Sequence, residues 1–225
     1  MKKNILFILS IVLFTCTQAA ETEGYYISKT NDTVRGKVDV IVKSNIIRFD
    51  KMTFDVKFSV NGEKFKKIDR ESVNGFGFTY EGKQYDLVTW NVKANKQLYL
   101  ISPLGDVAPD GIYFIVRSEE GAMPIYSLFQ QIDDNAYKNT KPGAAAPDAA
   151  DYRYVFNGYK VKRDIIFHHP AKGYIYISDR YPLTMKFSEA LAYLGLEDEF
   201  TSTLSPKNKD LLDIVKKYNQ WKTAR

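Results

Sequence analysis

The sequence is poor in the residues that most often carry out chemistry. Its 225 residues include one cysteine and two histidines. The single cysteine, Cys16, excludes an intramolecular disulfide bond, and without a Cys-x-x-Cys motif or a Cys/His cluster no zinc site is expected. The chain also has no Gly-x-Ser-x-Gly elbow, no His-Glu-x-x-His motif and no phosphate-binding glycine loop. We therefore expect no cofactor and no metal.

The two histidines are neighbours, His168 and His169. Adjacent side chains of an extended segment point to opposite faces, so this pair is poorly placed to chelate one ion. Either histidine is also a conceivable general base beside a distant carboxylate. A structural role at the surface or half-buried is the preferred interpretation.

Paired carboxylates offer a second route to catalysis. Asp106 and Asp110 share one loop, and Asp133 and Asp134 share another. Two carboxylates suffice for glycoside hydrolysis if they converge in space. Acidic residues are also ordinary turn formers, and this reading is preferred here. A calcium loop near residues 133–135 lacks the spaced ligands of a known loop type.

Long apolar runs are absent apart from one at the start of the chain. Lys2 and Lys3 precede an apolar run at residues 5–14, which is followed by small and polar residues at 15–20. This order predicts a secretory signal peptide at residues 1–19. A permanent membrane anchor is disfavoured, because spanning a bilayer as a helix takes roughly 20 apolar residues.

Two processing routes compete for this leader. Small residues at Thr17 and Ala19 favour cleavage after Ala19, with cleavage after Ala20 as a close variant. Residues 13–16 instead resemble a lipoprotein box in which Cys16 would be lipidated. Phe14 and Thr15 are bulky for such a box, so simple cleavage is preferred.

The net charge is modest, at +5. Basic and acidic residues are interspersed along the chain, whereas a nucleic-acid binder concentrates basic residues on one stripe. We expect no nucleic-acid partner. The densest basic clusters are Lys64, Lys66 and Lys67, and then Lys160, Lys162 and Arg163. A solvated strand face is preferred to a binding patch for both clusters.

Most of the remaining chain alternates apolar and polar residues with period two, the mark of strands with one buried face. Residues 54–60 show the cleanest alternation, and Asn61-Gly62 is a strong hairpin signal. Gly75 and Gly77 lie inside a strand pattern and indicate close backbone approach or a bulge. The expected strands cover residues 25–28, 34–42, 46–49, 54–60, 64–68, 75–80, 84–90, 97–101, 112–117, 125–132, 152–156, 160–167 and 174–177.

The last forty residues change to helical spacing. Residues 187–194 predict a helix that is stopped by Gly195, and Ser205-Pro206 predicts the start of a second helix. Its apolar stripe contains Leu211, Leu212, Val215, Tyr218 and Trp221. Docking on the sheet is preferred to a free partner-binding helix.

The sequence thus predicts a mainly β (α+β) fold: an antiparallel sheet, sandwich or open barrel with one or two C-terminal helices packed on it. Residues 20–225 are expected to form one β-rich domain with helical segment 187–223. The Pro- and Ala-rich stretch at 138–150 is interpreted as a mobile loop, with an interdomain linker as the alternative.

Both ends of the chain carry a family likeness. Residues 24–27 with 31–38 resemble the opening of uncharacterised exported proteins of Bacteroidetes, in which a GYxI strand leads to a DTxxGK hairpin. Residues 73–76 and 214–219 are also similar to theirs. Asn31 departs from the glycine usual in that turn, but asparagine also accepts a left-handed conformation. The resemblance implies export to the periplasm or outer envelope of a Gram-negative bacterium, and it supplies no information about an activity.

The same resemblance implies one modification. Asp32-Thr33-Val34 looks like the O-glycan acceptor that such bacteria use, which would place the glycan on Thr33. The alternative is a plain turn in which Asp32 and Thr33 bond to the backbone.

Together these patterns favour a non-catalytic exported envelope protein that acts as a binding or structural accessory. The expected partner is an envelope protein or a glycan, and membrane contact is expected only through a lipid on Cys16. The alternative is a hydrolase of envelope or extracellular polymers that uses dispersed carboxylates. The abundant tyrosines suit a pleated sheet surface and also suit sugar- or peptide-binding platforms.

Overall fold

A computed structural model describes residues 18–43, 45–92, 111–132, 154–156, 159–178, 186–205 and 210–225. Most of the expected leader, the strand expected at 97–101 and the expected loop at 138–150 lie outside these residues. The strands are β1 (Gln18–Ser28), β2 (Thr33–Lys43), β3 (Ile46–Ile47), β4 (Lys57–Ser59), β5 (Lys66–Lys67), β6 (Val73–Tyr80), β7 (Lys83–Asn91), β8 (Ile112–Glu119), β9 (Ile125–Ile132), β10 (Tyr154–Phe156), β11 (Tyr159–His169) and β12 (Gly173–Ser178). The helices are α1 (Phe49–Met52), α4 (Phe187–Leu194), α5 (Asp198–Thr201) and α6 (Leu211–Thr223).

The strands form one 12-stranded sheet with every described pair antiparallel. Its order is β10-β11-β9-β8-β7-β6-β1-β2-β4-β5, with β12 paired to β11 and β3 paired to β2. The sheet is open, because the described strands at its two ends do not pair with each other. The mainly β fold with C-terminal helices is therefore confirmed, in the form of an open sheet.

Two apolar clusters lie on this sheet. One contains buried residues of β2, β4, β6 and α1, and the other combines β9, β11 and β12 with α4, α5 and α6. Strand β8 contributes residues to both clusters. Phe114 and Val116 belong to the first cluster, and Tyr113 and Ile115 belong to the second. Alternate residues of a strand face opposite sides, so the central strands are buried on both faces.

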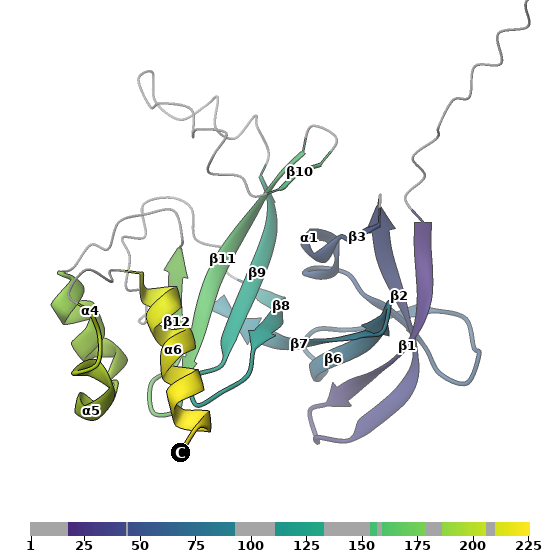
Figure 1. Cartoon of the computed structure of the whole chain (residues 1–225). Coiled ribbons are helices and arrows are strands. Elements are labelled where there is room, and N and C mark those ends of the chain that lie inside the picture. The colour runs from purple at the N-terminus through teal and green to yellow at the C-terminus, as the bar shows by residue number, and fades with distance from the viewer. Residues whose placement is uncertain are drawn as a thin grey trace, which may run out of the picture.

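The three C-terminal helices gather at one end of the molecule. Figure 1 shows α4, α5 and α6 beside β12 and β11, whereas β1 and β2 lie at the other end of the sheet. Helix α4 occupies the predicted residues and ends at Gly195, which adopts φ 59. The predicted cap Ser205 is wrong: Asp210 caps α6, and its carboxylate accepts from the N–H groups of Leu212 and Asp213. A carboxylate there satisfies amides of the first turn that have no partner in the helix.

One side chain fixes α6 to the sheet. Asn219 is 3% exposed and accepts from the Met123 N–H at 2.8 Å, while its amide donates to the Met123 carbonyl at 3.0 Å. Met123 lies in the connection between β8 and β9. The helix is thus held at the sheet by polar as well as apolar contacts.

The expected strand at 54–60 is wrong in its first half. Only Lys57–Ser59 is a strand, and Phe54 is 38% exposed. The amides of Phe54 and Asp55 both donate to the Lys51 carbonyl, which continues the turn of α1. The expected strand at 46–49 likewise shortens to β3, because Phe49 begins α1. The first expected strand, at residues 25–28, is also too short, because β1 begins at Gln18.

Asn31 and Asn61 lie in turns that the sequence predicts, and they adopt φ values of 66 and 51. A Cβ on Gly75 would lie 2.3 Å from the Leu87 carbonyl oxygen, so close backbone approach is confirmed there. Gly77 is crowded by the Tyr25 ring instead.

Candidate functional site

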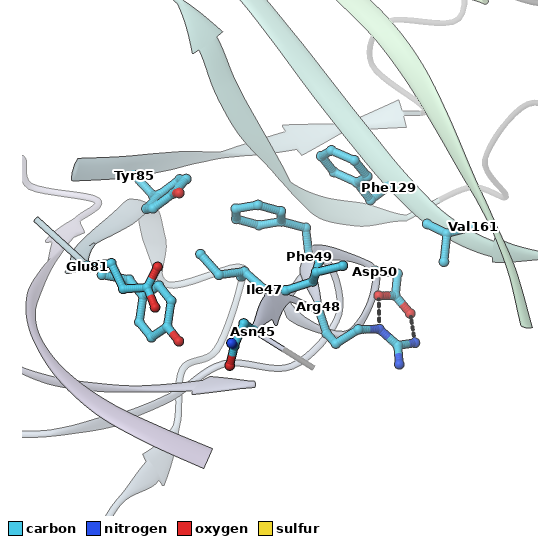
Figure 2. A pocket seen from close by; sticks show the side chains of 11 residues that line it. Asn45, Ile47, Arg48, Phe49, Asp50, Glu81, Tyr85, Phe129 and Val161 are labelled. Atoms are coloured by element: carbon cyan, nitrogen blue, oxygen red, sulfur yellow. Dashed lines mark hydrogen bonds and ion pairs between the residues drawn. The ribbon is translucent and has the colours of Figure 1, made fainter. Parts of the chain in front are cut away.

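Four segments that are distant in sequence meet around a cavity (Figure 2). The β2–β3 turn with α1, the β6–β7 turn, β9 and β11 all contribute. The cavity volume is about 260 Å³, and we call it the aromatic cavity. Its lining residues are Asn45, Ile46, Ile47, Arg48, Phe49, Asp50, Tyr80, Glu81, Tyr85, Phe129 and Val161.

Three rings form one wall of the aromatic cavity. Phe49 contacts Tyr85 at 5.5 Å and Phe129 at 5.3 Å between ring centroids. Phe78 stacks on Tyr85 at 5.4 Å. Such tilted and stacked pairs add about 0.5–1.5 kcal/mol each beyond area burial. The wall is therefore held in place before any ligand arrives.

The segment that carries Phe49 is anchored on both sides. The Arg48 N–H donates to the Ile41 carbonyl of β2 at 2.8 Å. The Thr53 hydroxyl donates to the Phe129 carbonyl of β9 at 3.0 Å, and the Phe114 N–H of β8 donates to the Thr53 carbonyl at 3.1 Å. Segment 48–53 thus bridges strands that are far apart in the sheet order.

A buried ion pair borders the aromatic cavity near Val161 (Figure 2). Arg48 Nε donates to Asp50 Oδ1 at 2.7 Å, and Arg48 Nη2 donates to Oδ2 at 2.6 Å. The residues are 7% and 3% exposed. Removing one partner would leave a buried charge uncompensated, at a cost of about 3–5 kcal/mol. Both carboxylate oxygens of Asp50 accept hydrogen bonds from Arg48, so the pair is a structural element of the cavity.

The rim is polar except for one residue. Asn45 and Glu81 adopt positive φ values in the two turns, and Ile46, which follows Asn45 in the chain, is 46% exposed. Partial burial and the neighbouring Glu81 carboxylate raise the pKa of Tyr80. A side chain such as Ile46 at the mouth of an apolar cavity leaves apolar surface in contact with water.

The carboxylates of the aromatic cavity do not converge. Figure 2 shows Glu81 and Asp50 at opposite ends, with Ile47 and Phe49 between them. Carboxylate-based hydrolysis requires two groups that flank one bond. This geometry suits the binding of an apolar group better than acid–base chemistry.

Most residues that the sequence singled out lie elsewhere. Cys16 and the four aspartates Asp106, Asp110, Asp133 and Asp134 fall outside the described residues. Thr33 is the exposed first residue of β2, and within the described ranges its hydroxyl makes no hydrogen bond. The Asp32 carboxylate accepts from the Thr30 hydroxyl. The acceptor expected for a glycan is therefore accessible in the folded chain.

The histidines lie at the end of β11 and not in the aromatic cavity. The His168 ring contacts Tyr174 at 4.7 Å, and burial lowers the pKa of His168. His169 Nδ1 accepts from the N–H groups of Ala171 and Lys172 at 3.0 and 3.1 Å. Burial, followed by the charge of Lys172, lowers the pKa of His169. His169 thus stabilises the β11–β12 turn.

Two lysines of the first basic cluster are paired with nearby acids. Lys66 lies 3.3 Å from Glu63, and Lys67 forms an ion pair with Asp55. Arg163 donates to the Ser127 hydroxyl at 2.9 Å. Exposed pairs of this kind are typical of a solvated strand face.

Sequence reasoning did not identify the residues of the aromatic cavity as a site. The sequence places Phe49 and Tyr85 in the strands expected at 46–49 and 84–90 and gives neither residue a place in a site. The nearest signal is the Arg48-Phe49-Asp50 triplet, in which two opposite charges flank an aromatic residue. A triplet this short is frequent by chance.

Within the described residues, no three His, Cys, Asp or Glu side chains are placed to hold a metal ion. No helix in the same ranges is long and apolar enough to cross a bilayer. Comparisons with protein-family models, with curated proteins and with solved structures find no match to this chain.

Proposed function

We propose that this chain is an exported envelope protein that acts without catalysis, by holding one apolar or aromatic side chain of a partner protein in the aromatic cavity. The observation that carries the proposal is the preformed wall of Phe49, Tyr85 and Phe129 with the exposed Ile46 at its mouth. Interfaces commonly concentrate their binding energy in one anchor side chain seated in such a cavity.

The size of the aromatic cavity supports a side chain over a larger ligand. Its volume of about 260 Å³ is below the roughly 300–1,000 Å³ typical of small-molecule sites. The paired charges of Arg48 and Asp50 compensate each other at close range. An uncharged anchor therefore meets no unbalanced charge at that end of the cavity.

The experiment is a two-dimensional NMR titration of the folded chain with single-residue probes. N-acetyl-phenylalanine amide and N-acetyl-leucine amide are the apolar probes, and N-acetyl-glutamine amide is the polar one. We expect the apolar probes to shift the amide signals of residues 45–50 and 80–85, and the polar probe to leave them unchanged.

Ile46→Ser should weaken binding of the apolar probes by about fivefold, because it removes apolar surface worth about 1 kcal/mol. Phe54→Ser is the matched control, since Phe54 is the other large apolar side chain exposed among the described residues and lies outside the cavity. Shifts confined to residues outside the cavity, or equal effects of the two substitutions, would contradict the proposal.

A further inference from the structure

The uncovered face of the sheet carries a second, polar hollow. Its volume is about 390 Å³, and we call it the sheet-face groove. It is lined by Glu23, Gly24, Tyr25, Arg35, Thr79, Gln84 and Asp86. Gln84 and Asp86 alternate with Tyr85 along β7, so the groove and the aromatic cavity lie on opposite faces of the β6–β7 hairpin.

A tyrosine ring forms the floor of the sheet-face groove. In register, Tyr25 lies between Arg35 on β2 and Gly77 on β6. A Cβ on Gly77 would lie 2.6 Å from Tyr25 Cζ, so the ring lies directly over this glycine. The absence of a side chain at Gly77 leaves room for the ring, which lines the groove.

The Tyr25 hydroxyl is fixed by Asp86. It donates to Asp86 Oδ1 at 2.7 Å, and burial together with this bond raises the pKa of Tyr25 to about 12. Gln84 Nε2 donates to the same oxygen at 2.8 Å, and the Thr79 hydroxyl donates to Gln84 Oε1 at 2.9 Å. The carboxylate and the amide are thus oriented before any ligand binds.

Charge in the sheet-face groove is mixed and nearly balanced. Asp86 Oδ2 lies 3.9 Å from Arg117 Nη1. Arg35 is exposed, and within the described residues its guanidinium makes no hydrogen bond and no ion pair. Glu23 supplies a carboxylate to the same groove. Donors and acceptors therefore lie side by side, and the two carboxylates exceed the one lining guanidinium by a single charge.

We infer that the sheet-face groove binds a neutral, hydroxyl-rich ligand, a saccharide unit. A sugar ring presents an apolar C–H face that stacks on an aromatic ring such as Tyr25. Its hydroxyls both donate and accept, and planar groups such as the Arg35 guanidinium and the Asp86 carboxylate bond them in pairs. An anionic ligand would meet Glu23 and Asp86, and an apolar ligand would desolvate Glu23 and Arg35 without offering them a hydrogen-bond partner.

The test is an NMR titration of the full chain with defined oligosaccharides. The probes are neutral cello-, chito- and mannohexaose, with an oligogalacturonate of the same length as the anionic comparison. We expect at least one neutral hexasaccharide to shift the signals of residues 23–25, 35, 77–79 and 84–86. The oligogalacturonate should bind more weakly than that neutral sugar.

Arg35→Ala should weaken saccharide binding by about tenfold or more, because it removes a charged hydrogen-bond donor. Lys37→Ala is the matched control, since it removes a cation two residues along the same face of β2 but outside the groove. Tyr25→Phe keeps the ring and loses the bond to Asp86, so it should retain measurable binding, whereas Tyr25→Ala should abolish it.

Thermal unfolding of each variant shows whether it is folded, and Arg35→Ala provides the decisive result because Arg35 is exposed. Tighter binding of the anionic sugar, shifts outside the groove, no shift with any hexasaccharide, or equal losses in Arg35→Ala and Lys37→Ala would overturn the inference. Ile46→Ser should leave saccharide binding unchanged. The saccharide inference and the function proposed for the aromatic cavity are therefore tested independently.

Discussion

His169 shows how one side chain links the fold to pH. Its Nδ1 accepts two backbone hydrogen bonds in the β11–β12 turn, which requires an unprotonated nitrogen. Burial and then Lys172 lower its pKa below the ordinary value of about 6.5. The unfolded chain therefore binds more protons than the folded one below that value. The stability that depends on neutral His169 is complete above about pH 6.5 and is lost as the pH falls toward the folded-state pKa.

His169→Asn should reduce this acid sensitivity. Asparagine Oδ1 takes the position of Nδ1 along the side chain, so it accepts the same amides in an Asx-type turn without titrating in this range. Urea denaturation at pH 5 and pH 8 measures the effect: the difference in unfolding free energy between the two pH values should be smaller than in the parent chain. His169→Ala is the control, and it should lower stability at both pH values.

An unchanged pH difference in His169→Asn would contradict the assignment of the acid sensitivity to this turn. His168 also has a lowered pKa. His168→Phe keeps a ring against Tyr174, so this variant measures the part of the pH dependence of stability that is due to His168. The chain has no other histidine, so the two variants account for all histidine titration.

At the scale of elements, α6 is attached to the sheet through Asn219. Asn219→Ala should destabilise the chain by about 1–3 kcal/mol, because it leaves the Met123 N–H and carbonyl buried without their partner. Urea denaturation followed by tryptophan fluorescence measures the loss. Gln220→Ala is the control on the exposed side of the same helix and should change stability by less than about 0.5 kcal/mol. Equal effects would show that apolar packing alone holds the helix.

Period-two and period-3.6 patterns located most of the elements in advance. Strands β2, β6, β7 and β9 and helix α4 lie where alternation or helical spacing placed them. These elements have at least one face against an apolar cluster, so their pattern records the burial that stabilises them. The fold class could be predicted from the sequence for this reason.

The strand predicted at residues 54–60 is wrong in its first half because packing and hydrogen bonds override the local pattern there. Phe54 continues the alternation of Val56 and Phe58, yet the hydrogen bonds to the Lys51 carbonyl keep it in the α1 turn. Its ring then packs at 5.4 Å against Tyr113, a residue that is distant in sequence. Local patterns contain no information about such a partner.

The aromatic cavity was beyond sequence reasoning for a similar reason. Phe49, Tyr85 and Phe129 belong to three elements, and only the register of the sheet brings them together. The sheet-face groove depends on register as well, since Tyr25 meets Asp86 across Gly77 on the intervening strand β6. The tyrosines were visible in the sequence as possible binding platforms, but their neighbours were not.

At the scale of the whole molecule, the two apolar clusters are joined by shared strands. Leu87 belongs to one cluster and Trp90, on the same strand, to the other, and β8 is divided in the same way. The aromatic cavity lies beside the first cluster, because Phe49, Tyr85 and Phe129 pack against that cluster. Strands β7 and β8 therefore connect it to the cluster beneath the C-terminal helices.

The start of β1 lies at the same end of the sheet as β3 and α1 (Figure 1). Gln18 pairs with Val42 of β2, and Ile46 follows four residues later. A lipid on Cys16 would therefore hold the mouth of the aromatic cavity close to a bilayer. Cleavage after Ala19 would free that mouth and remove from β1 only the pairs that Gln18 and Ala19 make with Val42 and Ile41.

We propose cleavage after Ala19, because small residues occupy the positions that signal peptidase reads. The protein isolated from its native host should then have the mass of residues 20–225 and remain in the aqueous phase on detergent partitioning. Cys16→Ser should change neither result. A chain that begins at residue 16, carries lipid mass and loses both lipid and membrane partitioning in Cys16→Ser would show the other route. Thr33→Ala separates any glycan mass from a lipid mass. The outcome decides the partner that the aromatic cavity can reach, because a tethered cavity meets only molecules at the bilayer surface whereas a free one samples the whole compartment.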